Sequence, residues 1–235
     1  MNPLLRSERL PGIWCVGCGL HGFLASFANG VDLSRIPHRG LTVVSGIGCS
    51  GRAAGYLNLD GFHVTHGRAI PFATGLTLAN PKLKAAVVSG EGDLFAIGGN
   101  HFIHAARRNM EMLVLCLNNR TFGMTGGEIT PATPAGARAA AALRGNPERP
   151  FDLVKLATSA GATFVARIDA LRSRELAQCV AQGLRHKGFA FIEVETRCPT
   201  YYGRRNGPAP SGRQGVFRKV VEPTYRKRLQ ELYRS

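Results

Sequence analysis

The chain has 235 residues, 44% of them hydrophobic, and a formal net charge of +15. This length and apolar content suit one large domain, or one domain with a tail, and no run of about 18 apolar residues indicates a transmembrane helix. The N-terminus has no apolar signal-peptide region, so we expect a cytoplasmic protein without membrane association, whose six cysteines are thiols or ligands rather than disulfides.

Much of the positive charge lies in the C-terminal part of the sequence. A basic tail suits an acidic protein partner, a polyanionic cofactor or nucleic acid, or serves solubility only, and charge alone does not separate these roles. We find no helix-turn-helix, RNA-recognition or finger signature and no aromatic residues interleaved with the arginines, which argues against nucleic acid. The basic residues concerned are Arg197, Arg204, Arg205, Arg213, Arg218, Lys219, Arg226, Lys227, Arg228 and Arg234.

The first motif along the chain is a C-x-x-C pair, Cys15 and Cys18, before a predicted helix at residues 20–29. Two cysteines at this spacing suit a redox dithiol, half of a zinc site or half of an iron–sulfur site. A thioredoxin-type dithiol follows directly on a strand, whereas residues 6–12 are polar and interrupted by proline. The redox-dithiol hypothesis is therefore disfavoured.

Residues 41–45 are predicted to form a buried strand that ends in the glycine-rich turn 46–52. Glycines at the carboxyl end of a strand free backbone N–H groups to face an anion, and they place Cys49 and Arg52 at the rim where ligands bind in α/β sheets. A plain strand-to-helix turn is the alternative. The Arg52 guanidinium at such a rim suits a carboxylate or a phosphate.

Four histidines need an interpretation. His63 and His66 precede a predicted helix at residues 69–78, where histidines are most often structural, and catalysis by His66 is the competing hypothesis. His101 and His104 share one face of a later helix, and we interpret them as helix-surface or core residues.

The centre of the sequence carries the strongest pattern. A strand at 85–88 is followed by a Gly-Glu-Gly-Asp turn at 90–93, a crossover helix, and a second strand at 112–117 that ends in two asparagines. Because parallel strands joined by a crossover finish at the same edge of a sheet, Glu91, Asp93 and the asparagine pair should converge there. Oxygen ligands beside glycine N–H groups suit a metal and a phosphate.

The rest of the chain continues the alternation of helices and strands. Residues 128–150 are rich in proline and glycine and form a long excursion of the kind that covers sites. Predicted helices at 151–159 and 172–186 alternate with predicted strands at 163–167 and 189–195.

This alternation predicts an α/β fold with a doubly wound, mostly parallel sheet. We place one domain at residues 1–198 and a basic C-terminal extension at 199–235.

The six cysteines fall into two groups. Cys116 and Cys179 lie within apolar segments and are predicted to be core residues. The other four lie in turns marked by glycine or proline, where four thiolates suit a tetrahedral zinc or an iron–sulfur cluster, and their spacing does not decide between the two. These four are Cys15, Cys18, Cys49 and Cys198.

Several motifs, in the same order, resemble those of the β subunit of 2-oxoacid:ferredoxin oxidoreductases. The similarity covers about residues 14–199, and residues 125–134 are most similar to the 2-oxoglutarate branch. The motifs are Cys15-Val16-Gly17-Cys18-Gly19, Gly46-Ile47-Gly48-Cys49-Ser50, His66-Gly67-Arg68-Ala69, Gly90-Glu91-Gly92-Asp93, Gly98-Gly99-Asn100-His101, Asn118-Asn119 and Thr125-Gly126-Gly127.

The resemblance implies a thiamine-diphosphate-binding fold and a set of site residues. Glu91, Asn119 and the backbone carbonyl of Thr121 would bind Mg²⁺, Arg52 would meet the substrate carboxylate, and His66 is the second candidate catalytic residue. The four turn cysteines would bind one [4Fe-4S] cluster. The residues that would line the cofactor are Ile47, Cys49, Ser50, Gly92, Asp93, Gly123 and Met124.

One residue departs from the family. The family usually has Asp where this chain has Glu91, and Mg²⁺ requires near-octahedral geometry at about 2.0–2.1 Å from its oxygens. The extra methylene moves the carboxylate by about a bond length, so the backbone must retreat or a water must intervene. We predict that Mg²⁺ still binds, at some cost in affinity.

The implied enzyme oxidatively decarboxylates a 2-oxoacid, in the first place 2-oxoglutarate, to acyl-CoA and CO₂ with electrons passed to ferredoxin, and it can run in reverse. In the family an α subunit supplies the carboxylate that activates thiamine, so the chain should be inactive alone and form a heterodimer, commonly doubled. Two alternatives remain open. One is a non-redox thiamine-diphosphate lyase or ligase subunit; the other is an inactive regulatory subunit, for which Glu91 is the only indication.

Overall fold

The computed structural model describes residues 2–233, and its centre is a seven-stranded sheet. The strand order is β2-β1-β3-β4-β6-β5-β7; all neighbours are parallel except β5 and β7, so the predicted mostly parallel sheet is confirmed. The strands are β1 (Leu41–Ser45), β2 (Asp60–His63), β3 (Lys84–Gly90), β4 (Met112–Asn118), β5 (Phe164–Asp169), β6 (Phe189–Glu195) and β7 (Gly215–Lys219).

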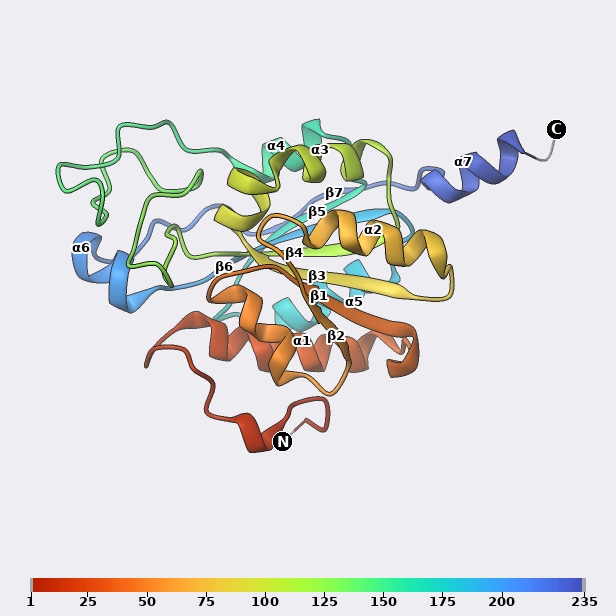
Figure 1. Cartoon of the computed structure of the whole chain (residues 1–235), viewed down its shortest axis with the longest axis horizontal. Helices are drawn as coiled ribbons and strands as arrows, with labels where there is room; N and C mark the ends of the chain where they lie inside the picture. Colours follow the sequence, from red (N-terminus) through yellow and green to blue (C-terminus); the bar gives the residue numbers. More distant parts are fainter. Residues whose placement is uncertain (1, 234–235) are drawn as a thin grey trace.

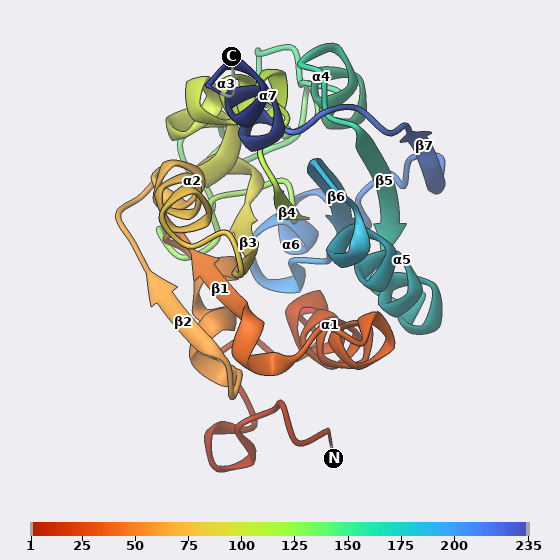
Figure 2. The same cartoon turned by 90° about the vertical axis from the view of Figure 1, so that its right-hand side faces the viewer.

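Helices cover both faces of this sheet (Figures 1 and 2). On one face, α1 (Gly19–Ser34) packs directly on α5 (Ser173–Arg185); a Cβ atom on Gly30 would lie 2.7 Å from Val180, so glycine permits the close approach. The other face carries α2 (Ala69–Ala79), α3 (Gly99–Arg107) and α4 (Leu153–Ser159). Each layer encloses its own apolar core against the sheet.

Shorter helical segments connect these elements. They are η1 (Ser7–Arg9), η2 (His38–Gly40), η3 (Ser50–Tyr56), η4 (Gly92–Ile97), η5 (Pro199–Gly203) and α6 (Arg204–Asn206), and α7 (Tyr225–Leu232) ends the described chain. None of the helices within residues 2–233 is long and apolar enough to cross a membrane.

The carboxyl ends of the parallel strands lie at one edge of the sheet, which we call the carboxyl edge. The long connection between β4 and α4 and the short α6 lie at this end of the molecule, and α7 projects from the opposite end (Figure 1). Residues 128–150 contain no helix and are held by loop hydrogen bonds, as expected of an excursion.

The predicted C-terminal extension does not lie apart from the sheet along its whole length. Its strand β7 pairs antiparallel with β5 and so forms one edge of the sheet. The extension therefore contributes to the fold, and beyond β7 it still contacts the body through the start of α7, where Arg226 pairs with Glu111 (2.8 Å). The rest of α7 projects from the body (Figure 1).

Candidate active site

A cavity of about 130 Å³ opens at the carboxyl edge, between the loops that follow β1, β3 and β4. Each residue that we predicted to line the cofactor lines this cavity, as do the three predicted Mg²⁺ ligands and His66. The lining residues are Ile47, Gly48, Cys49, Ser50, His66, Gly90, Glu91, Gly92, Asp93, Asn119, Thr121, Phe122, Gly123, Met124 and Thr125.

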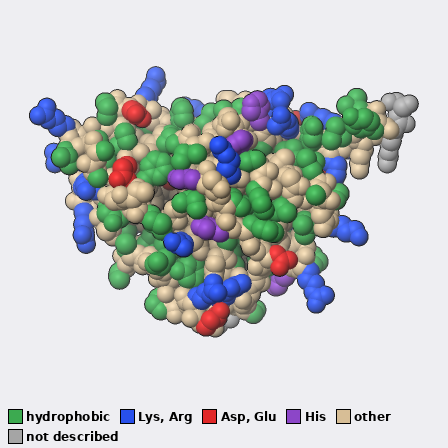
Figure 3. Space-filling view, viewed as in Figure 1, with side chains coloured by type: hydrophobic (Ala, Val, Ile, Leu, Met, Phe, Trp, Pro, Cys, Tyr) green, Lys and Arg blue, Asp and Glu red, His purple; other side chains and the backbone are tan. Residues whose placement is uncertain are grey.

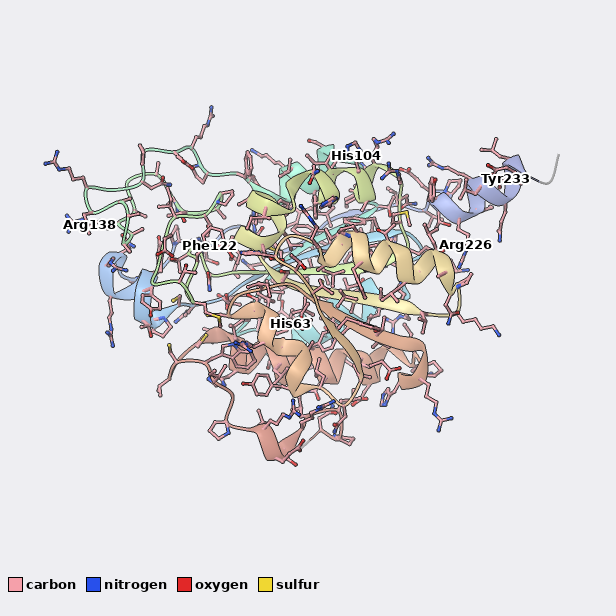
Figure 4. All side chains as sticks on the ribbon, viewed as in Figure 1. His63, His104, Phe122, Arg138, Arg226 and Tyr233 are labelled. Atoms are coloured by element: carbon pink, nitrogen blue, oxygen red, sulfur yellow. The ribbon has the colours of Figure 1, made fainter. Side chains whose placement is uncertain are left out.

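Glycines bring the walls of the cavity together. A Cβ atom on Gly92 would lie 2.2 Å from the Phe122 ring, and one on Gly46 would lie 2.0 Å from Asp93 Oδ2. Larger residues at either position would displace a wall. Phe122 thus lies directly over the Gly-Glu-Gly-Asp turn, near the carboxyl edge (Figure 4).

Glu91 is fully enclosed, with 2% of its surface exposed. Its Oε2 accepts a hydrogen bond from Asn119 N (3.3 Å), and its Oε1 accepts one from Thr130 Oγ1 (3.1 Å). Burial raises the pKa of the Glu91 carboxyl to about 7, which these hydrogen bonds and the charge of Arg120 only partly offset. A buried carboxylate without a directly bonded cation favours binding of a positive ion.

The two asparagines that follow β4 have different roles. Asn119 lines the cavity, and its Oδ1 accepts from Thr121 N (3.1 Å). Asn118 faces away and donates to Glu193 Oε1 (2.7 Å). The predicted convergence is therefore confirmed for Asn119 alone of the pair.

The donor set suits Mg²⁺ chemically. Glu91, Asn119 and the main chain at Thr121 offer carboxylate, amide and carbonyl oxygens, which are the hard ligands that Mg²⁺ takes. Within residues 2–233, no three His, Cys, Asp or Glu side chains already form a site for a single metal ion. The neutral oxygens and the diphosphate itself would therefore complete the coordination.

Asp93 lines the cavity, yet its oxygens are occupied by protein groups. Its Oδ1 accepts from Gly67 N (2.8 Å) and makes a short hydrogen bond with His66 Nδ1, and its Oδ2 makes a short hydrogen bond with Ser89 Oγ. The carboxylate consequently turns away from the space that a diphosphate would occupy.

The histidines occupy different surroundings. His66 lines the cavity with a third of its side chain exposed, and its ring meets the Phe122 ring edge-on at 6.1 Å between centroids. His63 is outside the cavity and pairs with Ser45 Oγ (3.1 Å). His101 Nε2 accepts a hydrogen bond from Arg68 Nη1 (2.9 Å), and His104 is exposed on α3 (Figure 4). The helix-surface interpretation of both is therefore confirmed.

The four turn cysteines come together beside the cavity. Cys18 N donates to Cys15 O (3.0 Å), and the next residue, Gly19, donates to Arg197 O (3.1 Å), which brings the C-x-x-C turn against Cys198. Burial raises the pKa of the Cys18 thiol to about 11, and the neighbouring charges of Cys198, Cys49 and Cys15 add to the effect. The other two cysteines, Cys116 and Cys179, are buried in the core as predicted.

Within residues 2–233 these thiols do not form a ready site for a single metal ion. In a four-iron cluster each thiolate binds a different iron, so the sulfur atoms stand further apart than around one zinc. Cys49, one of the four turn cysteines, also lines the cavity, and a Cβ atom on Gly123 would lie 3.4 Å from its Sγ. A cluster on these thiols would touch the wall of the cofactor cavity.

Arg52 lies on η3 with its side chain exposed, outside the residues that line the cavity. Its assignment to the substrate carboxylate stays a prediction. Sequence reasoning overlooked Phe122, which lines the cavity, and Thr130 and Arg120, which act on Glu91. Thr130 lies in the Thr-Pro stretch of the excursion, and that stretch was the one available signal for it.

The chain is similar to a thiamine pyrophosphate enzyme family and to subunits of known oxidoreductases. Residues 46–194 match the model of the thiamine pyrophosphate enzyme family, C-terminal TPP-binding domain. The chain is 52% identical over 202 residues to 2-oxoglutarate synthase subunit KorB of Methanothermobacter thermautotrophicus, covering 86% of this chain and 71% of that protein. It is 48% identical over 209 residues to the same subunit of Methanocaldococcus jannaschii, covering 88% and 77%.

A solved structure is also similar over the whole of this chain. It is a 2-oxoglutarate:ferredoxin oxidoreductase from Magnetococcus marinus with 2-oxoglutarate, coenzyme A and succinyl-CoA bound. The TM-score is 0.89 at 27% sequence identity, and the match covers 100% of this chain and 94% of that one.

Proposed function

The chain belongs to the 2-oxoacid:ferredoxin oxidoreductase β subunits within the thiamine pyrophosphate enzymes, and we propose that its carboxyl-edge cavity holds the diphosphate end of thiamine diphosphate. The observation that carries the proposal is the convergence of Glu91, Gly92 and Asn119 on one cavity at the ends of β3 and β4. Strand ends of this kind are where α/β sheets bind phosphorylated ligands.

The reaction is the CoA-dependent oxidative decarboxylation of a 2-oxoacid, with electrons passed to ferredoxin. The names of the relatives favour 2-oxoglutarate as the substrate, and the product is then succinyl-CoA. When bound, thiamine diphosphate supplies the carbanion that attacks the 2-oxo carbon and the electron sink that lets CO₂ leave.

The residues of this chain would bind and orient the cofactor and its metal ion. Glu91, Asn119 and the Thr121 carbonyl would hold Mg²⁺ against the diphosphate, and the glycine N–H groups of the two turns would donate to its oxygens. Cys15, Cys18, Cys49 and Cys198 would hold a [4Fe-4S] cluster next to the cofactor, so that electrons leave one at a time over a short distance.

An α subunit completes the site, as the designation of the relatives as β subunits implies. The cavity of about 130 Å³ is smaller than the roughly 300 Å³ or more that a whole cofactor-sized ligand fills, so another chain must enclose the rest of the cofactor. We expect a heterodimer, perhaps paired, working in the cytoplasm where coenzyme A and ferredoxin are found.

The test is to purify the chain anaerobically with its α partner and to assay CoA-dependent reduction of a viologen dye. We expect a brown protein with broad visible absorption, reduction with 2-oxoglutarate, and at least tenfold slower reduction with pyruvate. Omission of coenzyme A or of the α subunit should abolish the signal. A colourless protein that is indifferent to each 2-oxoacid would refute the proposal.

A further inference from the structure

Asp93 lines the cofactor cavity, but its carboxylate oxygens are hydrogen-bonded to protein groups. It is 2% exposed, and donors reach it from two loops and from strand β3: Gly67 N at 2.8 Å, Ile47 N at 3.4 Å and the Ser89 hydroxyl. An acidic side chain directed at a diphosphate would repel it, so an Asp at this position needs another purpose. The fourth donor, His66, indicates what that purpose is.

The hydrogen bond from His66 fixes which ring nitrogen carries the proton. A carboxylate only accepts, so the shared proton belongs to Nδ1 of the imidazole. Nε2 is then the nitrogen left for a ligand, and within the described chain no hydrogen bond occupies it. Because His66 lines the cavity and packs edge-on against Phe122, its ring is held at the wall of the cavity in which the cofactor would bind.

We propose that Asp93 is a positioning residue that holds His66 with Nδ1 protonated and Nε2 toward the substrate, where His66 acts as the general acid. The proposal rests on the proposed function. Attack at the 2-oxo carbon breaks the C=O π bond, and its electron pair moves to the oxygen. That oxygen takes the proton from Nε2 of the imidazolium, which returns to neutral imidazole with Nδ1–H still bonded to Asp93.

The hydrogen bonds around Asp93 explain why the residue that holds His66 carries a carboxylate. Four donors meet the two oxygens of Asp93, so an amide in its place would turn an N–H group against one of them. The bond to Nδ1 prevents the His66 ring from turning that nitrogen to the cavity. Gly46 makes room for this carboxylate, since a Cβ atom there would lie 2.0 Å from Asp93 Oδ2. The Asp93 oxygens thus act through His66 and do not contact the cofactor.

The variants Asp93→Asn and His66→Gln in the αβ complex test this assignment. We expect each to lower kcat by about 100-fold, the usual contribution of a general acid, while KM and the dissociation constant for thiamine diphosphate change by less than about threefold. Since the two residues act as a unit, the double variant should be no slower than either single one. The control is His63→Gln: His63 lies outside the cavity and bonds Ser45, so this variant should change kcat by less than about threefold.

Two outcomes would overturn the proposal. Asp93→Asn could weaken thiamine diphosphate binding more than tenfold with kcat unchanged at saturating cofactor, which would make Asp93 a cofactor ligand. Neutron diffraction on deuterium-exchanged crystals of the wild-type complex could place the His66 deuterium on Nε2 alone, with none on Nδ1. This second measurement needs neither activity nor a variant that folds, so it separates failure here from failure of the proposed function.

Discussion

Glu91 is the residue whose substitution is most informative about the metal. In Glu91→Asp the carboxylate retreats by about a bond length, which gives Mg²⁺ the spacing usual in the family but removes the bond from Thr130 Oγ1. We expect cofactor affinity at saturating Mg²⁺ to be preserved or up to about tenfold higher, with about 1 kcal/mol lost in stability. Calorimetric titration of thiamine diphosphate and thermal unfolding measure the two effects.

The control for this variant is Thr130→Val, which removes the same hydrogen bond and leaves Glu91 at its full length. It should reproduce the loss of stability without improving affinity. Weaker cofactor binding by Glu91→Asp would show that the longer side chain is not strained.

Cys198 gives the sharpest test of the cluster. Cys198→Ser in the αβ complex should lower the iron content from about four atoms per chain to nearly none, because a cubane cluster without one thiolate is not retained. Cys179→Ala is the matched control: Cys179 is buried in α5, so its variant should keep iron and lose only about 1 kcal/mol of stability. Full iron in Cys198→Ser would contradict the ligand set.

At the residue scale, the sequence predicted which residues share the cavity but not what each one does. Glu91 and Asn119 follow neighbouring parallel strands, and topology alone brings such residues together. The bond between His66 and Asp93 spans 27 positions, and that between Arg120 and Glu195 spans 75. No local pattern predicts such pairs, since each depends on how distant loops fold over one another.

At the scale of elements, the buried strands were predictable and the edge strands were not. The central β4 and β6 are buried at each position, and both begin with apolar runs, although β6 ends with Glu193 and Glu195. The edge strand β2, Asp-Gly-Phe-His, is exposed throughout, and β7 lies within a basic tail, so neither carries an apolar pattern. Their pairing follows from sheet neighbours that a sequence does not display.

Glu195, at the end of β6, hydrogen-bonds to the C-terminal segment at Ser211 and Gly212. This buried carboxylate accepts from Arg120 Nη2 (2.9 Å), Ser211 Oγ (2.7 Å) and Gly212 N (3.1 Å), and Arg120 directly follows the asparagine pair. The segment thereby holds the turn that carries the predicted metal ligands. A solubilising role alone would need none of these contacts.

We expect Glu195→Gln to lower the free energy of unfolding by about 3 kcal/mol, because it leaves the Arg120 guanidinium buried without its anion. Limited proteolysis should then cut near residues 207–214. The control is Glu222→Gln, which removes an exposed partner of Arg218 and should cost less than about 1 kcal/mol. Equal losses of stability in urea unfolding would contradict this role of Glu195.

His186, which follows α5, makes the stability depend on pH. Burial lowers the pKa of His186 to about 4, with the charges of Lys84 and Lys219 adding to the effect. Between about pH 4 and 6.5 the unfolded chain therefore binds a proton that the folded chain does not, so stability falls as the pH falls through this range. We expect a loss of about 1 kcal/mol, because solvent screens a half-exposed ring.

Urea unfolding at pH 6.5 and 4.5 measures this effect on the wild type and on His186→Gln. The variant should lose less stability on acidification, since glutamine does not titrate. His104→Gln, at an exposed position of α3, should behave as the wild type does. An identical pH dependence in all three would assign the acid sensitivity to other groups.

At the scale of the whole molecule, the excess of Lys and Arg over Asp and Glu gives the chain a strongly positive net charge. Figure 3 shows Lys and Arg side chains around the rim of one face, with few acidic ones between them. The net charge of +15 produces a field that draws in anionic partners from any direction. Within that field, the exposed Cys15 and the neighbouring exposed Arg197 mark where the proposed cluster comes nearest to solvent.

An acidic ferredoxin should therefore be reduced at a rate that depends on salt. We expect the second-order rate constant to fall by about tenfold or more between low and roughly 0.5 M ionic strength, because screening shortens the reach of the field. Stopped-flow reduction of the ferredoxin by the αβ complex measures this rate. A cationic viologen is the control, since its reduction should not slow with salt; the same slowing for both acceptors would mean that salt acts on the enzyme and not on the encounter.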